Sequence, residues 1–114
     1  MSQPDQGPAA RRWSRHKIDV RLKVSFPKEG KNDFAYGRAN SLSRGGIGAY
    51  IPCSIPVGTA VRLELTFPYS STEAKLDAII RTCEGFRYGL EFTRVSDDMQ
   101  EMIVKNCNGT EMLQ

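Results

Sequence analysis

The sequence has few of the residues on which enzymes and metal sites usually depend. His16 is the only histidine, and the three cysteines lie far apart with no zinc-ligand spacing. A catalytic triad needs a positioned base, but this histidine stands in a basic segment near the N-terminus. The acidic pair Asp97–Asp98 is better explained by helix capping than by acid–base catalysis. We therefore expect no enzymatic activity, no metal site and no cofactor.

Long hydrophobic runs are also missing. No apolar stretch approaches the roughly 20 residues that a membrane-spanning helix requires. Met1–Ala10 contains prolines and polar residues, which predicts a disordered lead rather than a secretory signal. The odd number of separated cysteines (Cys53, Cys83 and Cys107) indicates reduced, mostly buried thiols. These features predict a cytoplasmic protein without membrane insertion.

The length and charge of the chain suit one small domain. Its 114 residues can bury a single core, and a net charge of +3 permits an anionic partner without favouring a nucleic-acid polymer. Six segments of alternating hydrophobicity are separated by turn residues, which is typical of an antiparallel barrel or sandwich. Most aromatic residues fall at inward positions of these strands. The predicted strands are Lys17–Phe26, Phe34–Leu42, Gly46–Ile51, Ala60–Phe67, Ala74–Cys83 and Arg87–Arg94.

Helical spacing replaces the alternation after the last strand. Apolar residues recur three and four positions apart, which predicts a helix that packs one face on the core. Ser96 or Asp97 is placed to cap its N-terminus, and Asp97 with Gln100 has capping-box spacing. Asn108–Gly109 is expected to end the helix, with residues 108–114 as a loose tail. The apolar positions are Met99, Met102, Ile103 and Cys107.

A polar turn separates the second and third predicted strands. Ser43 is followed by Arg44, Gly45 and Gly46. The two glycines would let the backbone take positive φ and approach another group closely. Free backbone N–H groups beside hydroxyls can hold an anion, although an ordinary hairpin turn has a similar composition.

A basic arm precedes the first strand. Arg11, Arg12 and Arg15 lie within five residues, with Trp13 among them. The planar guanidinium binds phosphate bidentately, stacks on purines and reaches guanine O6 and N7. The arm is therefore suited to closing on an anionic nucleotide, but a solvated basic tail or a nucleic-acid arm would look similar.

Two spaced motifs connect the arm with the turn. Arg11 and Arg15 form Arg-x-x-x-Arg, and Ser43 and Gly46 match the last two positions of Asp/Asn-x-Ser-x-x-Gly. In this order and strand setting they resemble the PilZ family, whose domains bind the bacterial second messenger cyclic di-GMP. The resemblance implies an all-β fold over residues 11–107: a six-stranded antiparallel split β-barrel with a C-terminal α-helix.

The resemblance also implies which residues bind the ligand. Ser41 occupies the Asp/Asn position, and losing one charge-assisted hydrogen bond there costs about 1.5–3 kcal/mol. Asn40, one residue earlier, would compensate if a local bulge turned it toward the ligand. The implied ligand-binding residues are Arg11, Arg12, Arg15, Ser41, Ser43, Arg44 and Gly46.

These features support the hypothesis of a single-domain receptor and adaptor. Its arm would close over cyclic di-GMP, and an unidentified downstream protein would read the changed surface. One alternative is a PilZ-like interaction adaptor that does not bind cyclic di-GMP. A second is a barrel that binds single-stranded nucleic acid through the basic arm, against which the inward aromatic positions argue.

Overall fold

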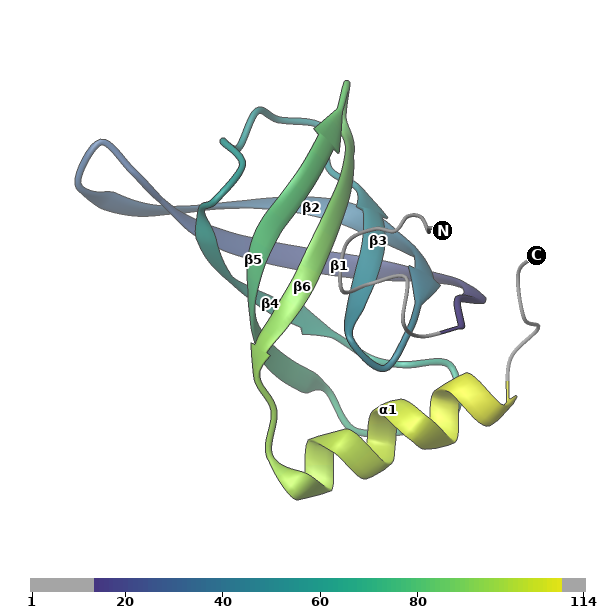
Figure 1. Ribbon diagram of the computed structural model, residues 1–114. Helices are drawn as coiled ribbons and strands as arrows, with labels where there is room; N and C mark the ends of the chain where they lie inside the picture. The colour runs from purple at the N-terminus through teal and green to yellow at the C-terminus, as the bar shows by residue number, and fades with distance from the viewer. Residues whose placement is uncertain (1–13, 110–114) are drawn as a thin grey trace, which may run out of the picture.

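The computed structural model describes residues 14–109, which form a closed antiparallel barrel with one helix across its end (Figure 1). Around the barrel the order is β1-β2-β3-β6-β5-β4, and β4 pairs back on β1. The predicted six-stranded barrel with a C-terminal helix is thus confirmed, and closure decides against a sandwich. The elements are β1 (His16–Lys28), β2 (Lys31–Leu42), β3 (Gly46–Tyr50), β4 (Ala60–Leu65), β5 (Ala74–Glu84), β6 (Arg87–Arg94) and α1 (Asp97–Gly109).

Some of the regions predicted from the sequence lie at the ends of the chain, outside the described residues. These are the lead Met1–Ala10, the arm residues 11–13 and the last part of the tail. The helix continues through Asn108 to Gly109, where the sequence predicted the start of a loose tail. Its N-cap is Ser96, whose Oγ accepts a hydrogen bond from the Met99 N–H at 3.2 Å. No helix within residues 14–109 is long and apolar enough to cross a membrane.

Alternating side chains fill the barrel, as the sequence pattern predicts. The core contains inward residues of all six strands and is closed by Ile103 and Cys107 of α1. Val20 is an exception, because the pairing of β1 with β2 shifts between Lys17 and Val20 and leaves this valine only partly buried. The inward positions predicted for the last three strands are all buried: Val61, Leu63, Leu65, Phe67, Leu76, Ala78, Ile80, Tyr88, Leu90 and Phe92.

The prediction that most aromatic residues face inward is wrong. Among the described residues, Phe34, Tyr36, Tyr50, Tyr69 and Phe86 are exposed. The β1–β2 hairpin projects from the barrel (Figure 1), because only Leu22–Ser25 of β1 pairs with β4. Rings on its outer face have no second layer to cover them. Cations from β1 pack on two of these rings, Arg21 on Tyr36 at 4.3 Å and Lys23 on Phe34 at 4.6 Å.

The prediction of mostly buried thiols is also only partly right. Cys107 is buried, Cys53 is half-buried and Cys83 is exposed. Cys83 lies near the end of β5, beyond the closed part of the core, and its Sγ donates to the Gly85 carbonyl oxygen at 3.3 Å. Of the three thiols, only that of Cys107 is therefore buried as the sequence predicts.

Asn106 of α1 is a fully buried polar residue that attaches the helix to the β4–β5 loop. Its Oδ1 accepts from the Tyr69 N–H at 2.7 Å, and its Nδ2 donates to Ser70 Oγ at 3.0 Å.

We expect Asn106→Ala to lower the free energy of unfolding by about 2–4 kcal/mol, because buried partners lose their hydrogen bonds and a cavity remains. Urea denaturation followed by circular dichroism measures this loss. Asn108→Ala, on the exposed side of the same helix, is the control, and equal losses in both variants would contradict the assigned role.

Candidate ligand-binding groove

A groove of about 940 Å³ lies on the outer face of the barrel where β3 pairs with β6. Gly46 and Gly48 alternate with inward residues of β3, and Gly48 lies directly opposite Gly89 of β6. These glycines add no side chain of their own to the floor, where the Ser41 and Thr82 hydroxyls lie beside Gly48 and Gly89. Arg15 also lines the groove.

Close contacts surround the glycines of the floor. A Cβ on Gly46 would lie 2.2 Å from the Leu90 carbonyl oxygen, and one on Gly89 would lie 2.4 Å from Thr82 Oγ1. The positive φ expected at Gly45 and Gly46 is not found: the described glycines with positive φ are Gly30, Gly58 and Gly85. Close approach of the strands, rather than a special backbone conformation, explains why glycine stands at position 46.

The Ser43 hydroxyl organises the turn between β2 and β3. Ser43 is only 4% exposed, and its Oγ accepts from the N–H groups of Gly45 at 3.2 Å and Gly46 at 3.1 Å. The Ser43 N–H in turn donates to the Gly46 carbonyl oxygen at 2.9 Å. These glycine N–H groups, which the sequence suggested as anion donors, are thus already used inside the turn.

A β-bulge in β2 brings two polar side chains to the same wall of the groove. Ala39 pairs with Ala49 while Ser41 pairs with Gly48, so that Asn40 is the extra residue. A Cβ on Gly48 would lie 2.4 Å from Ser41 Oγ and 3.3 Å from Asn40 Oδ1. The bulge considered from the sequence is therefore present, and it places the Asn40 amide beside the Ser41 hydroxyl.

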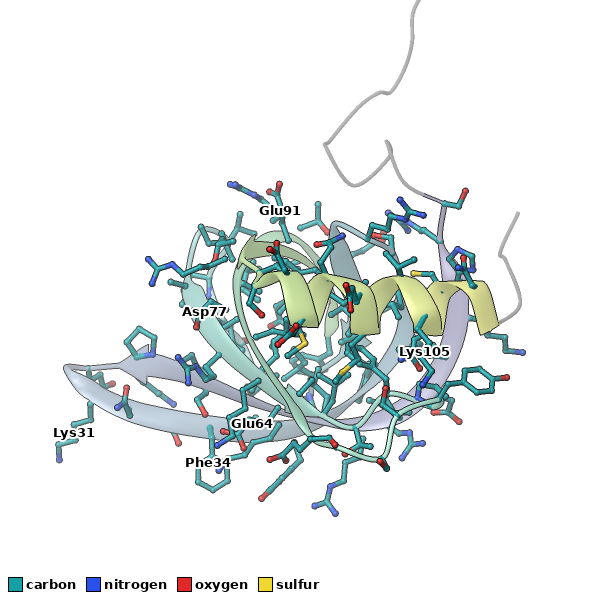
Figure 2. All side chains as sticks on the ribbon, turned by 90° about the horizontal axis from the view of Figure 1, so that it is seen from below. Lys31, Phe34, Glu64, Asp77, Glu91 and Lys105 are labelled. Atoms are coloured by element: carbon teal, nitrogen blue, oxygen red, sulfur yellow. The ribbon has the colours of Figure 1, made fainter. Side chains whose placement is uncertain are left out.

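The opposite wall contains an ion pair that the sequence analysis missed. Arg81 of β5 and Glu91 of β6 both line the groove, with Nε and Oε1 2.5 Å apart. Figure 2 shows Glu91 on the side of the barrel away from Phe34 and Glu64. Alternation marks both residues as outward, since each follows a buried residue, but the strand register that joins them is not readable from the sequence.

The structure gathers some of the predicted site residues and not others. Arg15, Ser41, Ser43 and Gly46 line the groove, whereas Arg44 does not. Burial raises the pKa of the Cys107 thiol, and the Arg44 guanidinium opposes this by lowering that pKa, which places Arg44 near α1. Arg11 and Arg12 lie outside the described residues. Within residues 14–109, no three histidine, cysteine or acidic side chains cluster as metal ligands would.

Comparison with solved structures shows where else this fold occurs. The PilZ domain of CeSA from a cellulose-synthesizing bacterium has 18% identity and a TM-score of 0.64, covering 83% of this chain and 95% of that one. The PilZ domain of YcgR from Escherichia coli, solved with c-di-GMP, has 16% identity and a TM-score of 0.66, covering 88% and 90%. The Bacillus subtilis inhibitor of motility MotI/DgrA has 15% identity and a TM-score of 0.67, covering 95% and 51%. At these identities the likeness concerns the fold.

Comparison of the sequence with family models gives a more direct assignment. A search of curated protein sequences finds no match. The model of the PilZ domain, however, matches residues 9–109, which include the basic arm, all six strands and the helix. The match thus spans both motifs and the groove between them, and the chain belongs to the PilZ family.

Proposed function

We propose that this chain is a cyclic di-GMP receptor that binds the dinucleotide over the glycine floor and relays the signal to another protein. The observation that carries this proposal is the gathering of Arg15, Ser41 and Gly46 around one groove. Its volume of about 940 Å³ suits a ligand of this size. Membership of a family of cyclic di-GMP receptors supports the same conclusion.

The groove offers a contact for each part of the dinucleotide. The Arg15 guanidinium binds a phosphate or a guanine edge, and a base lies on the floor of Gly46, Gly48 and Gly89, which add no side chains of their own. Asn40 supplies an amide acceptor where the motif has Asp or Asn, so that the Ser41 hydroxyl is not the sole polar group on that wall.

The relay is proposed from the position of Arg15. Arg15 immediately precedes β1, and drawing its side chain onto the ligand repositions the residues before it. A downstream protein in the cytoplasm reads this altered surface. The function is therefore binding and adaptation rather than catalysis.

Titration calorimetry with cyclic di-GMP tests the proposal, with GMP as the monomeric control. We expect saturable heat for the dinucleotide and much weaker binding of GMP, because one nucleotide reaches only part of the groove. No heat at millimolar cyclic di-GMP would instead support the adaptor that has lost its ligand. The neutral Ser41 and the occupied Ser43 hydroxyl are the observations that favour that alternative.

The exposed aromatic residues favour a second candidate, binding of single-stranded nucleic acid. Phe34 and Tyr36 lie two positions apart on β2, with Arg21 and Lys23 packed on their rings. Rings and cations on one exposed face are typical of stacking platforms for bases. A salt-dependent electrophoretic shift of a single-stranded RNA oligonucleotide would support this function, and no shift at low salt would reject it.

A further inference from the structure

We propose that Arg81 and Glu91 together read the purine base in the groove and select guanine over adenine. This inference rests on the proposed function, since it concerns how the same groove recognises its ligand. It assigns a specificity role to two residues outside both sequence motifs.

Strand pairing places the Arg81–Glu91 pair beside the glycine floor. Glu91 lies directly opposite Gly46, and the next outward residue of β6 is Gly89. On β5, Ile80 pairs with Leu90 and Thr82 with Gly89, so Arg81 is the extra residue of a bulge. Bulges redirect side chains and often adjoin functional sites. Here the bulge accompanies an Arg81 side chain that reaches across to β6 and ion-pairs with Glu91.

The ion pair leaves hydrogen-bonding capacity for a ligand. Arg81 and Glu91 side chains are 53% and 28% exposed, so neither is enclosed by the barrel. One Nε–Oε1 contact uses one of the five guanidinium donors and one of the two carboxylate oxygens. The pair therefore presents N–H donors next to a carboxylate acceptor at the groove wall.

This order of donor and acceptor matches guanine. Guanine has the O6 acceptor next to the N1–H and N2–H donors, so Arg81 can donate to O6 while Glu91 accepts from N1 or N2. Adenine has the reverse order, with the N6 donor next to the N1 acceptor. It would set donor against donor and acceptor against acceptor, which leaves polar groups unpaired and costs affinity.

A matched ion pair on another face provides the control. Arg62 of β4 and Asp77 of β5 lie directly opposite each other, with Nε and Oδ1 3.2 Å apart. Neither residue lines the groove. Breaking this pair removes a cross-strand Arg–carboxylate contact of the same kind without touching the proposed reading surface.

The experiment measures calorimetric affinities for cyclic di-GMP and cyclic di-AMP in the wild type and three variants. The wild type should prefer cyclic di-GMP. Glu91→Gln should weaken cyclic di-GMP binding about tenfold to a hundredfold and reduce this preference, whereas Asp77→Asn should change neither. The doubly exchanged variant Arg81→Glu/Glu91→Arg keeps an ion pair but reverses the order of donor and acceptor, and it should lose the preference for guanine.

The outcomes separate this inference from the proposed function. If the wild type does not bind cyclic di-GMP, the receptor function itself is overturned. If it binds, the inference fails when Glu91→Gln retains wild-type affinity and selectivity, or when the exchanged variant still prefers guanine. Equal wild-type affinity for the two dinucleotides also overturns it. Circular dichroism verifies that the variants are folded, as expected for an exposed ion pair.

Discussion

Replacing Arg15 by alanine is expected to weaken cyclic di-GMP binding about tenfold to a hundredfold. Arg15 lines the groove and forms no ion pair with any other residue that the structure describes. Its guanidinium is thus available for charge-assisted, bidentate hydrogen bonds to a phosphate or to guanine. Each such interaction is worth about 1.5–3 kcal/mol, and alanine removes it without disturbing the core. Titration calorimetry measures the change in affinity.

Arg21→Ala is the matched control for this experiment. Arg21 also belongs to the N-terminal part of the chain and is replaced with the same change in charge, but it packs on Tyr36 of the projecting hairpin. Its loss should leave cyclic di-GMP affinity nearly unchanged. Arg15→Lys separates geometry from charge, since lysine cannot form the planar fork. If Arg15→Ala and Arg21→Ala reduce affinity equally, Arg15 acts only through overall charge, and arm closure is wrong.

Gly46→Ala is expected to lower the free energy of unfolding by about 3 kcal/mol. The added Cβ would lie 2.2 Å from the Leu90 carbonyl oxygen, which is backbone of the neighbouring strand and cannot rotate away. β3 and β6 must therefore separate along the groove floor, and ligand affinity should fall with stability. Urea denaturation followed by circular dichroism measures the loss.

Gly89→Ala adds a Cβ to the same floor, but this Cβ would meet a side-chain atom instead of a backbone atom. The added Cβ would lie 2.4 Å from Thr82 Oγ1, which is the end of a side chain that can adopt another rotamer. We expect a stability loss below about 1 kcal/mol, because strain is relieved without moving the strands. Similar losses for Gly46→Ala and Gly89→Ala would show that backbone contact at Leu90 does not constrain the barrel.

Much of the fold is predictable because it depends on local patterns. Alternation from Val61 to Phe67 and from Tyr88 to Phe92 marks which side chains face the core, and these positions are buried. The helical spacing after Ser96 similarly predicts α1 and the buried face that contains Ile103. Both patterns are informative because apolar residues repeated at the period of a strand or a helix fall on one face, and burying that face stabilises the element.

Bulges limited the prediction of the site. The Asn40 and Arg81 bulges insert one residue into the ladder, and each changes which side chains share a face. The local sequence around them resembles any other alternating strand, so it predicts a role for Asn40 only conditionally and does not single out Arg81. Ser43 lines the groove, but its hydroxyl hydrogen-bonds within its own turn, which depends on backbone conformation.

The sequence alone predicts six strands in chain order, the buried faces of the last three, and an arginine motif and a glycine-rich turn on the same chain. Only the fold shows that β3 lies between β2 and β6, which forms the groove, and that the bulged pairing of β5 with β6 joins Arg81 to Glu91. It also decided that Phe34 and Tyr36 are exposed on a projecting hairpin. Periodicity describes one strand at a time, whereas register, closure and bulges are set by how strands pair with one another.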